Sequence, residues 1–119
     1  MTASILVIED QEDLRWLLER TLSQRGFQVR TAATGQDGLS VARSETCPVL
    51  ILDYQLPDMN GLDVLRELRA ITPDVRVILI TAAGTPRLRE EALRAGAFAY
   101  FEKPFDVEEL IMFVRQALG

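Results

Sequence analysis

Histidine is absent from this chain of 119 residues, and cysteine and lysine each occur only once. Without histidine the chain has no Ser-His-Asp or Cys-His catalytic group, no imidazole ligand for a metal and no phosphohistidine of its own. The single cysteine, Cys47, excludes an internal disulfide and a zinc site built from several cysteines. Any chemistry must therefore depend on carboxylates, hydroxyls and the one lysine amine, that of Lys103.

Long hydrophobic runs and an excess of positive charge are also lacking. No stretch approaches the roughly 18 apolar residues of a membrane span, and the N-terminal segment turns acidic after one short apolar run, unlike a signal peptide. The net charge of -5 argues against nucleic-acid binding, because phosphates are neutralised by a concentrated basic surface. We expect a cytoplasmic protein in which residues 1–119 form one domain, without direct contact to a membrane or to nucleic acid.

Five short segments have the pattern of β-strands, and amphipathic segments separate them. Residues 4–9, 49–53 and 75–81 are β-branched or continuously apolar, as in strands buried on both faces, whereas 27–32 and 97–103 alternate more and are predicted to be edge strands. Helices are predicted from apolar spacing and from capping residues. The residues that mark them are Leu14, Leu17, Leu18, Leu22 and Gly26; Thr34, Leu39 and Ala42; Leu62, Leu65 and Leu68; Pro86, Leu88, Leu93 and Gly96; and Asp106, Glu109, Leu110, Val114 and Leu118.

Strands that alternate with helices predict an α/β fold with one doubly wound parallel sheet. Right-handed crossovers put helices on both faces, and the leading strand order is 2-1-3-4-5, the flavodoxin-like arrangement. In such sheets ligands bind outside the carboxyl ends of the strands. Functional residues are therefore expected where the strands end.

Four of the predicted strands end in residues that can handle a charged ligand. Strand one ends at Glu9 and Asp10, strand three at Asp53, strand four at Thr81 and strand five at Lys103. Each residue alone could simply cap a helix or face water. Their convergence on one edge of the sheet favours a binding site.

The carboxylates at this edge need a counter-charge. Strands one and three are neighbours in the predicted order, so Asp10 and Asp53 should lie close together, and two such charges at about 4 Å repel by roughly 4 kcal/mol at an effective dielectric of about 20. Either some of these acids are protonated or a cation lies among them. Oxygen ligands without sulfur or imidazole favour Mg²⁺, with Mn²⁺ as a substitute, and a magnesium shell with open positions can accept a phosphoryl group.

The only lysine suits the same ligand. An ammonium is a compact point charge that can meet one phosphate oxygen in a narrow slot, whereas a guanidinium is a wide planar fork. Pro104 fixes the chain direction directly after Lys103, and a cis bond between them would aim the lysine back over the edge of the sheet.

These motifs resemble the bacterial response-regulator receiver domain, of the chemotaxis-receiver type, over the whole chain. The matching motifs are Glu9-Asp10, Asp53 followed by YQLPDMNG, Thr81-Ala82 and Lys103-Pro104-Phe105. The resemblance implies that Asp53 is the phosphoacceptor and that Thr81 and Lys103 each bind a phosphoryl oxygen. The other implied roles are magnesium binding by Glu9, Asp10, Asp53 and the Gln55 backbone carbonyl, switching by Thr81 and Tyr100, and loop or lysine positioning by Pro57, Gly61 and Pro104.

By this resemblance the protein is a phosphorylation-dependent signalling switch rather than a conventional enzyme, although it catalyses its own phosphorylation and dephosphorylation. The implied donor is a histidine kinase or a histidine phosphotransfer protein. The implied target is an output domain or effector, which binds the surface of helix four, strand five and helix five. The resemblance also implies that the phosphorylated protein can form a homodimer. Gln55 and Ala83 stand where the family tunes dephosphorylation, and they leave the phosphoryl lifetime open.

Several alternatives stay open at this point. Trp16, Met112 and Phe113 lie off the apolar helix stripes and could contact partners or pack on the core. A flavodoxin-like carrier shares the sheet, but acidic residues after strand one would repel its cofactor phosphate. An aspartyl-phosphate phosphatase needs a second aspartate two residues after the first, where this chain has Gln55.

Overall fold

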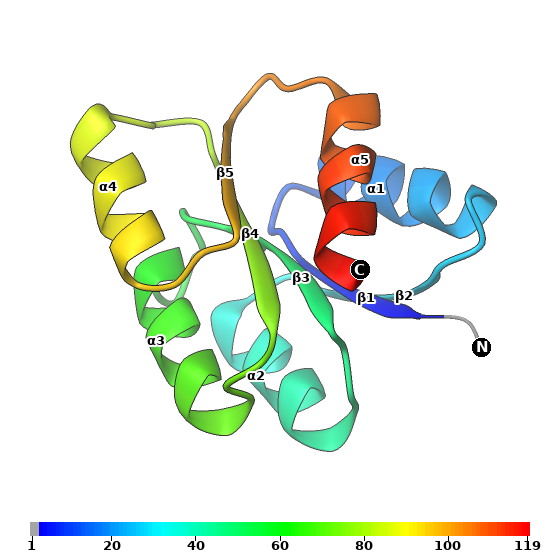
Figure 1. Cartoon of the computed structure of the whole chain (residues 1–119), viewed down its shortest axis with the longest axis horizontal. Helices are drawn as coiled ribbons and strands as arrows, with labels where there is room; N and C mark the ends of the chain where they lie inside the picture. Colours follow the sequence, from blue (N-terminus) through cyan, green and yellow to red (C-terminus); the bar gives the residue numbers. More distant parts are fainter. Residues whose placement is uncertain (1–2) are drawn as a thin grey trace.

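The computed structural model describes residues 3–119, in which strands and helices alternate along the chain (Figure 1). Every predicted strand and helix is present, and the strand ends differ from the predicted ones by two residues at most. In chain order the elements are β1 (Ser4–Ile8), α1 (Glu12–Gln24), β2 (Gln28–Ala32), α2 (Gly35–Ser44), β3 (Val49–Asp53), α3 (Gly61–Ile71), β4 (Arg76–Thr81), α4 (Pro86–Arg94), β5 (Ala99–Glu102) and α5 (Val107–Leu118).

The strands form one parallel sheet in the order β2-β1-β3-β4-β5, which confirms the predicted topology. A helix follows each strand and returns the chain to the same end of the sheet, so parallel pairing is the only arrangement that short connections permit. Ile8 pairs with Leu52, and Asp53 pairs with Ile80. This register brings the carboxyl ends of β1, β3 and β4 to a common edge.

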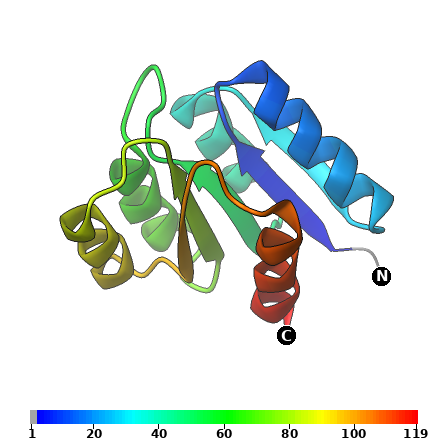
Figure 2. The same ribbon diagram turned by 90° about the horizontal axis from the view of Figure 1, so that it is seen from above.

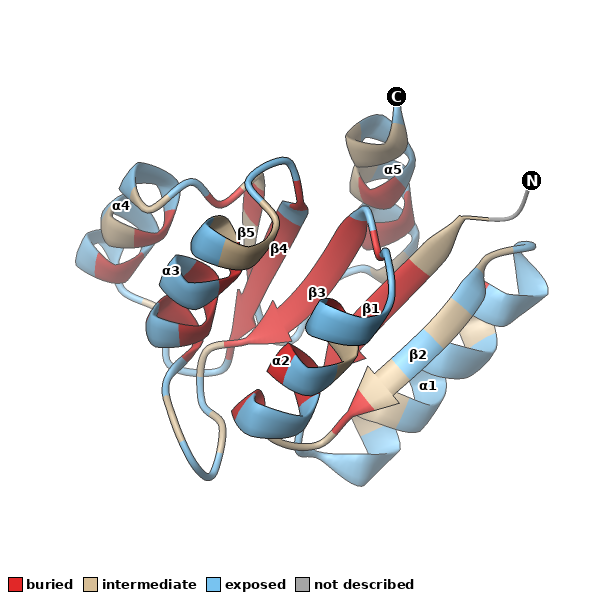
Figure 3. Cartoon of the chain, turned by 90° about the horizontal axis from the view of Figure 1, so that it is seen from below, coloured by how far each residue is buried: buried red, intermediate tan, exposed pale blue. Residues whose placement is uncertain are grey.

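Alternate residues of the central strands supply two separate cores. In β1, Ile5 and Val7 pack with α1 and α5, whereas Leu6 and Ile8 pack with α2, α3 and α4. The two groups of helices lie on opposite faces of the sheet (Figure 2). Residues of β1, β3 and β4 are buried almost throughout, as Figure 3 shows in red. Burial of both faces explains their nearly continuous apolar sequences and holds their carboxyl ends rigidly.

Two leucines used to predict helix faces are not part of the core. Leu17 is 41% exposed and Leu93 is 43% exposed, whereas their neighbours Leu18 and Ala92 are fully buried. Adjacent apolar residues on a helix point about 100° apart, so only one of each pair can face the sheet. The inclusion of Leu17 and Leu93 in the buried faces was therefore wrong.

The helix starts agree with the capping predictions. Thr34 and Asp106 accept hydrogen bonds from the backbone N–H groups of Asp37 and Glu108, respectively, although Glu109 was the expected partner for the second cap. Gly26 adopts a φ of 92° two residues after the end of α1, a conformation that other residues rarely adopt. Among residues 3–119, none of the helices has the length and apolar character needed to cross a bilayer.

Candidate phosphoacceptor site

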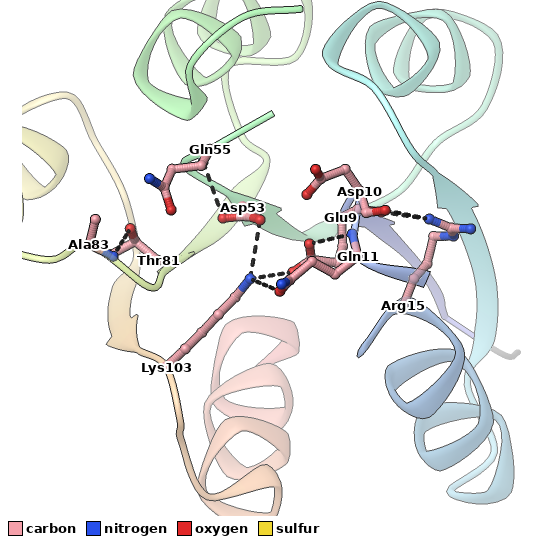
Figure 4. A network of polar contacts seen from close by, with 9 residues as sticks. All are labelled: Glu9, Asp10, Gln11, Arg15, Asp53, Gln55, Thr81, Ala83 and Lys103. Atoms are coloured by element: carbon pink, nitrogen blue, oxygen red, sulfur yellow. Dashed lines mark hydrogen bonds and ion pairs between the residues drawn. The ribbon is translucent and has the colours of Figure 1, made fainter. Parts of the chain in front are cut away.

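The predicted site residues meet at the carboxyl edge of the sheet. Asp53 and Thr81 are the last residues of β3 and β4, Glu9 directly follows β1, and Lys103 directly follows β5. Main-chain hydrogen bonds extend the sheet to this edge, since Lys103 N–H donates to the Thr81 carbonyl (2.8 Å). The side chains are therefore held by rigid strand ends rather than by mobile loops (Figure 4).

Three carboxylates form an acidic cluster at this edge. Glu9, Asp10 and Asp53 each offer an oxygen, and these oxygens all lie within 4.8 Å of one another. Glu9 and Asp53 are buried, whereas Asp10 is exposed. A cavity of about 130 Å³ opens beside Asp10 and Asp53 and is also lined by Gln55. The predicted proximity of the carboxylates is confirmed.

Among residues 3–119, Lys103 is the one cation that pairs with carboxylates of this cluster. Its Nζ lies 2.8 Å from Glu9 Oε1 and 3.2 Å from Asp53 Oδ2, and the Lys103–Pro104 peptide bond is cis. Burial works against the charged ammonium, but its contacts with Glu9 and Asp53 outweigh burial, so the pKa of Lys103 is raised. The ammonium is therefore protonated at neutral pH and offsets one negative charge of the cluster.

The ionised form of Glu9 is disfavoured at this site. Burial raises the pKa of Glu9 to about 7, and the hydrogen-bonded Asp53 beside it adds to the effect, while Lys103 and the Gln11 backbone N–H work in the opposite direction. Glu9 therefore lies near its titration midpoint at neutral pH. A divalent cation among these oxygens would remove the repulsion, so the donor set fits Mg²⁺ or Mn²⁺.

Without metal, the protein is expected to become less stable as the pH rises from about 5 to 8. Between the ordinary glutamate pKa of 4.5 and about 7, the folded protein keeps a proton on Glu9 that the unfolded chain has lost. Stability therefore falls through this window, by roughly 2 to 3 kcal/mol at most. Urea unfolding in EDTA at several pH values, followed by circular dichroism, measures this change.

A matched variant isolates the source of this pH dependence. Glu9→Gln retains the shape of the side chain but cannot titrate, so its unfolding free energy should be nearly flat between pH 5 and pH 8. Magnesium should stabilise the wild type more at pH 8 than at pH 5, because protons compete with the metal for the carboxylates. Stability that rises with pH in EDTA would contradict the interpretation of Glu9.

Thr81 lies at the edge but does not line the cavity. It is fully buried, and its hydroxyl accepts a hydrogen bond from Ala83 N–H (3.0 Å), whereas Ala82 forms that part of the cavity wall. Among the described residues no hydrogen bond joins the hydroxyl of Thr81 to Asp53. A bond from Thr81 to a phosphoryl oxygen would therefore require its hydroxyl to reorient, and this role remains a prediction.

Tyr100 is packed inward. Its ring lies against the core shared by α2, α3 and α4, and its hydroxyl is buried without a hydrogen-bond partner among residues 3–119. Burial, followed by the charge of Glu102, raises the pKa of this hydroxyl. A Cβ atom added at Gly84 would collide with the Tyr100 hydroxyl, so the turn after β4 leaves room for this ring position. The predicted switching motion of Tyr100 remains a prediction.

The loop from β3 to α3 carries the other predicted residues. Gln55 N–H donates to Asp53 Oδ1 (3.1 Å), and Gln55 pairs with Asn60 across the loop. Pro57 is exposed at the bend. Gly61 begins α3, and its N–H donates to the Tyr54 carbonyl (2.7 Å). The loop thus returns against the end of β3.

Asp58 anchors this loop and was missed by the sequence analysis. Its two carboxylate oxygens accept the backbone N–H groups of Gly35 (2.8 Å) and Gln36 (2.9 Å) at the start of α2. These two bonds, that of Gln36 first, lower the pKa of Asp58. The only hint in the sequence was an acidic residue next to Pro57. Its partners at the start of α2 are 23 and 22 residues away, so the sequence did not reveal the contact.

Gln11 and Arg15 were also missed. Gln11 Oε1 accepts a hydrogen bond from Lys103 Nζ (2.9 Å), and Arg15 Nη1 donates to the backbone carbonyls of Glu9 (3.0 Å) and Asp10 (3.4 Å) (Figure 4). Arg15 therefore holds the turn between β1 and α1. The only sequence signal was proximity to the Glu9-Asp10 pair.

The three suggested partner contacts have different environments. Trp16 is 55% exposed with Arg20 over its ring, and Met112 is 58% exposed. Phe113 is half-buried and packs edge-on against Phe101 at a centroid distance of 5.1 Å. Core packing therefore accounts for part of the Phe113 side chain, and its suggested contact with partners stays a prediction, whereas Trp16 and Met112 are more accessible.

Comparison with known proteins identifies the family. The protein-family model described as "Response regulator receiver domain" matches residues 5–115 of the chain. The chain is 34% identical to Sporulation initiation phosphotransferase F of Bacillus subtilis over 110 residues, which are 92% of this chain and 89% of that protein. It is 36% identical over 115 residues to Probable transcriptional regulatory protein TcrX of Mycobacterium tuberculosis, covering 97% of this chain but only 49% of that protein.

The fold comparison agrees. A CheY-like response regulator receiver domain protein from Methanospirillum hungatei superimposes with a TM-score of 0.95 at 27% identity, covering 99% of this chain and 94% of that one. The chain belongs to the response-regulator receiver-domain family, the phosphorylation-dependent signalling module of two-component systems and phosphorelays. The comparisons support neither a flavodoxin-like carrier nor an aspartyl-phosphate phosphatase.

Proposed function

We propose that residues 1–119 act as one receiver domain in which Asp53 accepts a phosphoryl group in a magnesium-dependent reaction. The donor is a phosphohistidine on a histidine kinase or a histidine phosphotransfer protein, because the chain has no histidine. The observation that carries the proposal is the position of the Lys103 ammonium, which lies between Glu9 and Asp53. These residues belong to a cluster of three carboxylates beside an open cavity.

An oxygen of the Asp53 carboxylate attacks phosphorus, and the new P–O bond forms as the P–N bond of the donor breaks. The electron pair of that bond stays on the imidazole nitrogen. Lys103 binds one phosphoryl oxygen, and Thr81 donates to another after its hydroxyl reorients. Glu9, Asp10, Asp53 and the Gln55 carbonyl would hold Mg²⁺, which when bound would supply positive charge near the phosphoryl oxygens. Water later attacks phosphorus, the P–O bond to Asp53 breaks, and inorganic phosphate leaves, which regenerates the Asp53 carboxylate at a rate that Gln55 and Ala83 influence.

Intact-mass measurement tests the proposal without a partner. With acetyl phosphate and Mg²⁺, the wild type should gain the mass of one phosphoryl group, which peptide mapping should locate at Asp53. The same incubation in EDTA should give little or no gain, because the developing negative charge then lacks its main counter-charge. Metal-independent uptake, or uptake at another residue, would refute the proposed reaction.

Phosphorylation then changes the surface of α4, β5 and α5. The phosphoryl group adds a charge of about -1.5 to -2 at Asp53. This charge draws the Thr81 hydroxyl toward the phosphoryl oxygens, and the movement of Thr81 changes the preferred position of the Tyr100 ring. To convert a mostly inactive population into a mostly active one, it must favour the active form by about 5.5 kcal/mol. The altered surface would bind an output domain, an effector or a second phosphorylated copy.

Trp16 is proposed to contact the histidine-containing partner. It is exposed on α1, which directly follows the cavity residue Gln11, and tryptophan frequently dominates binding energy when an interface buries it. Trp16→Ala should slow phosphoryl transfer from the cognate kinase by about tenfold or more. Its labelling by acetyl phosphate should not change, because no partner surface takes part.

Met112→Ala is the matched control, since Met112 is equally exposed but lies on α5. It should leave both the kinase reaction and the acetyl phosphate reaction close to wild type. A Trp16→Ala protein that loses both reactions would indicate damage to the fold rather than to docking.

A further inference from the structure

The Lys103 ammonium is surrounded by three protein oxygens. Asp53 Oδ2 (3.2 Å) and Gln11 Oε1 (2.9 Å) accept hydrogen bonds, and Glu9 Oε1 forms an ion pair at 2.8 Å. A lysine ammonium has three N–H donors and no acceptor. Gln11 and Asp53 thus take two of the three donors, and Glu9 lies within ion-pair distance of the same nitrogen, so a phosphoryl oxygen on Asp53 competes with these oxygens for Lys103.

Gln11 contacts both ends of the Glu9–Lys103 ion pair. Its backbone N–H donates to Glu9 Oε2 (3.0 Å), while its side-chain oxygen accepts from Lys103. Gln11, Glu9 and Lys103 therefore form a closed ring of polar contacts. The same glutamine lines the cavity beside Asp53, and it immediately precedes α1.

The three acceptors differ in how easily they can release the ammonium. Glu9 is fully buried, and a buried carboxylate without its counter-charge is costly. Phosphorylation removes the carboxylate charge of Asp53, but the charged phosphoryl oxygens are then attached to the same side chain, so the ammonium stays beside Asp53. Gln11 is exposed and neutral, so water can replace its bond to Lys103. A phosphoryl oxygen is charged and forms a stronger bond than an amide oxygen does. The exchange therefore favours release from Gln11.

We propose that Gln11 is a positioning residue that accepts one N–H of Lys103 in the unphosphorylated protein, holds the ammonium near Asp53, and releases this N–H to a phosphoryl oxygen. The release step rests on the proposed phosphoacceptor function. The holding step does not, because it concerns the unphosphorylated protein alone. The two steps can therefore be tested separately.

Lys103 can be observed directly because it is the only lysine. Labelling with ¹⁵N-lysine gives a single Nζ resonance, whose hydrogen exchange with water reports whether the N–H groups are held. Exchange should be about threefold faster or more in Gln11→Met, which keeps the side-chain length but removes the acceptor. Gln11→Glu should restore slow exchange, and Gln24→Met, at the exposed end of the same helix, should match wild type. Equal exchange in Gln11→Met and wild type would overturn the holding step.

Beryllofluoride, a phosphoryl mimic, tests the release. With Mg²⁺ and beryllofluoride, the Lys103 Nζ signal and the side-chain amide signals of Gln11 should shift together in the wild type. A Lys103 shift with unmoved Gln11 signals would overturn the release step alone. If beryllofluoride moved neither signal and acetyl phosphate also gave no mass gain, the proposed function would fail, and the release step with it.

Discussion

Asp53→Asn is expected to abolish phosphoryl uptake from acetyl phosphate. The amide has no negative charge and is a poor nucleophile, and no other carboxylate combines the position of Asp53 at the end of β3 with contacts to both Lys103 and Gln55. Intact mass after incubation with Mg²⁺ should show a gain for the wild type and none for the variant. The affinity for Mg²⁺ should fall by at least about tenfold, since loss of even an outer-shell partner has an effect of that size.

Asp63→Asn is the matched control for this experiment. Asp63 is an exposed aspartate on α3 that lies outside the acidic cluster, so its variant should take up phosphate and bind Mg²⁺ like the wild type. Cooperative urea unfolding of Asp53→Asn would show that its inactivity does not arise from misfolding. Equal phosphate uptake by Asp53→Asn and the wild type would exclude Asp53 as the acceptor.

The sheet was predictable because its central strands are buried on both faces. Continuous apolar runs such as 49–53 and 75–81 are too short for buried helices, and amphipathic segments separate them, so the sequence favours buried strands. Once the strands are parallel and each is followed by a helix, the crossover rules leave few orders, and all strands then end at one edge. The meeting of Asp53 with Lys103 followed from that topology, although they are 50 residues apart.

Side-chain contacts around the site were less predictable, for two physical reasons. Gln11 and Asp58 act through hydrogen bonds to partners that are 92 and 23 residues away, and a polar residue in a loop carries no periodic signal of its partner. The direction of exposed apolar side chains is also poorly specified by spacing alone. Leu17 and Leu93 were both misjudged because a helix face has diffuse borders.

Gly61→Ala is expected to lower the unfolding free energy by about 3 kcal/mol, near the upper end for overpacking. A Cβ atom at this position would lie 2.8 Å from the Asp53 carbonyl oxygen and 2.8 Å from Tyr54 Cα. Both are backbone atoms at the end of β3, so relief requires α3 or the phosphoacceptor strand to move. Urea unfolding monitored by circular dichroism measures the loss.

Gly35→Ala provides the matched comparison, because Gly35 is the first residue of α2 as Gly61 is of α3. A Cβ atom at Gly35 meets mainly the Met59 side chain, which can adopt another rotamer, so the expected loss is about 1 kcal/mol or less. Gly61→Ala should also slow phosphate uptake under conditions where it remains folded, since its strain falls on the main chain of Asp53. Equal destabilisation by the two alanines would mean that the backbone contact at Gly61 is not the cause, and that the start of α3 can shift without disturbing the acceptor.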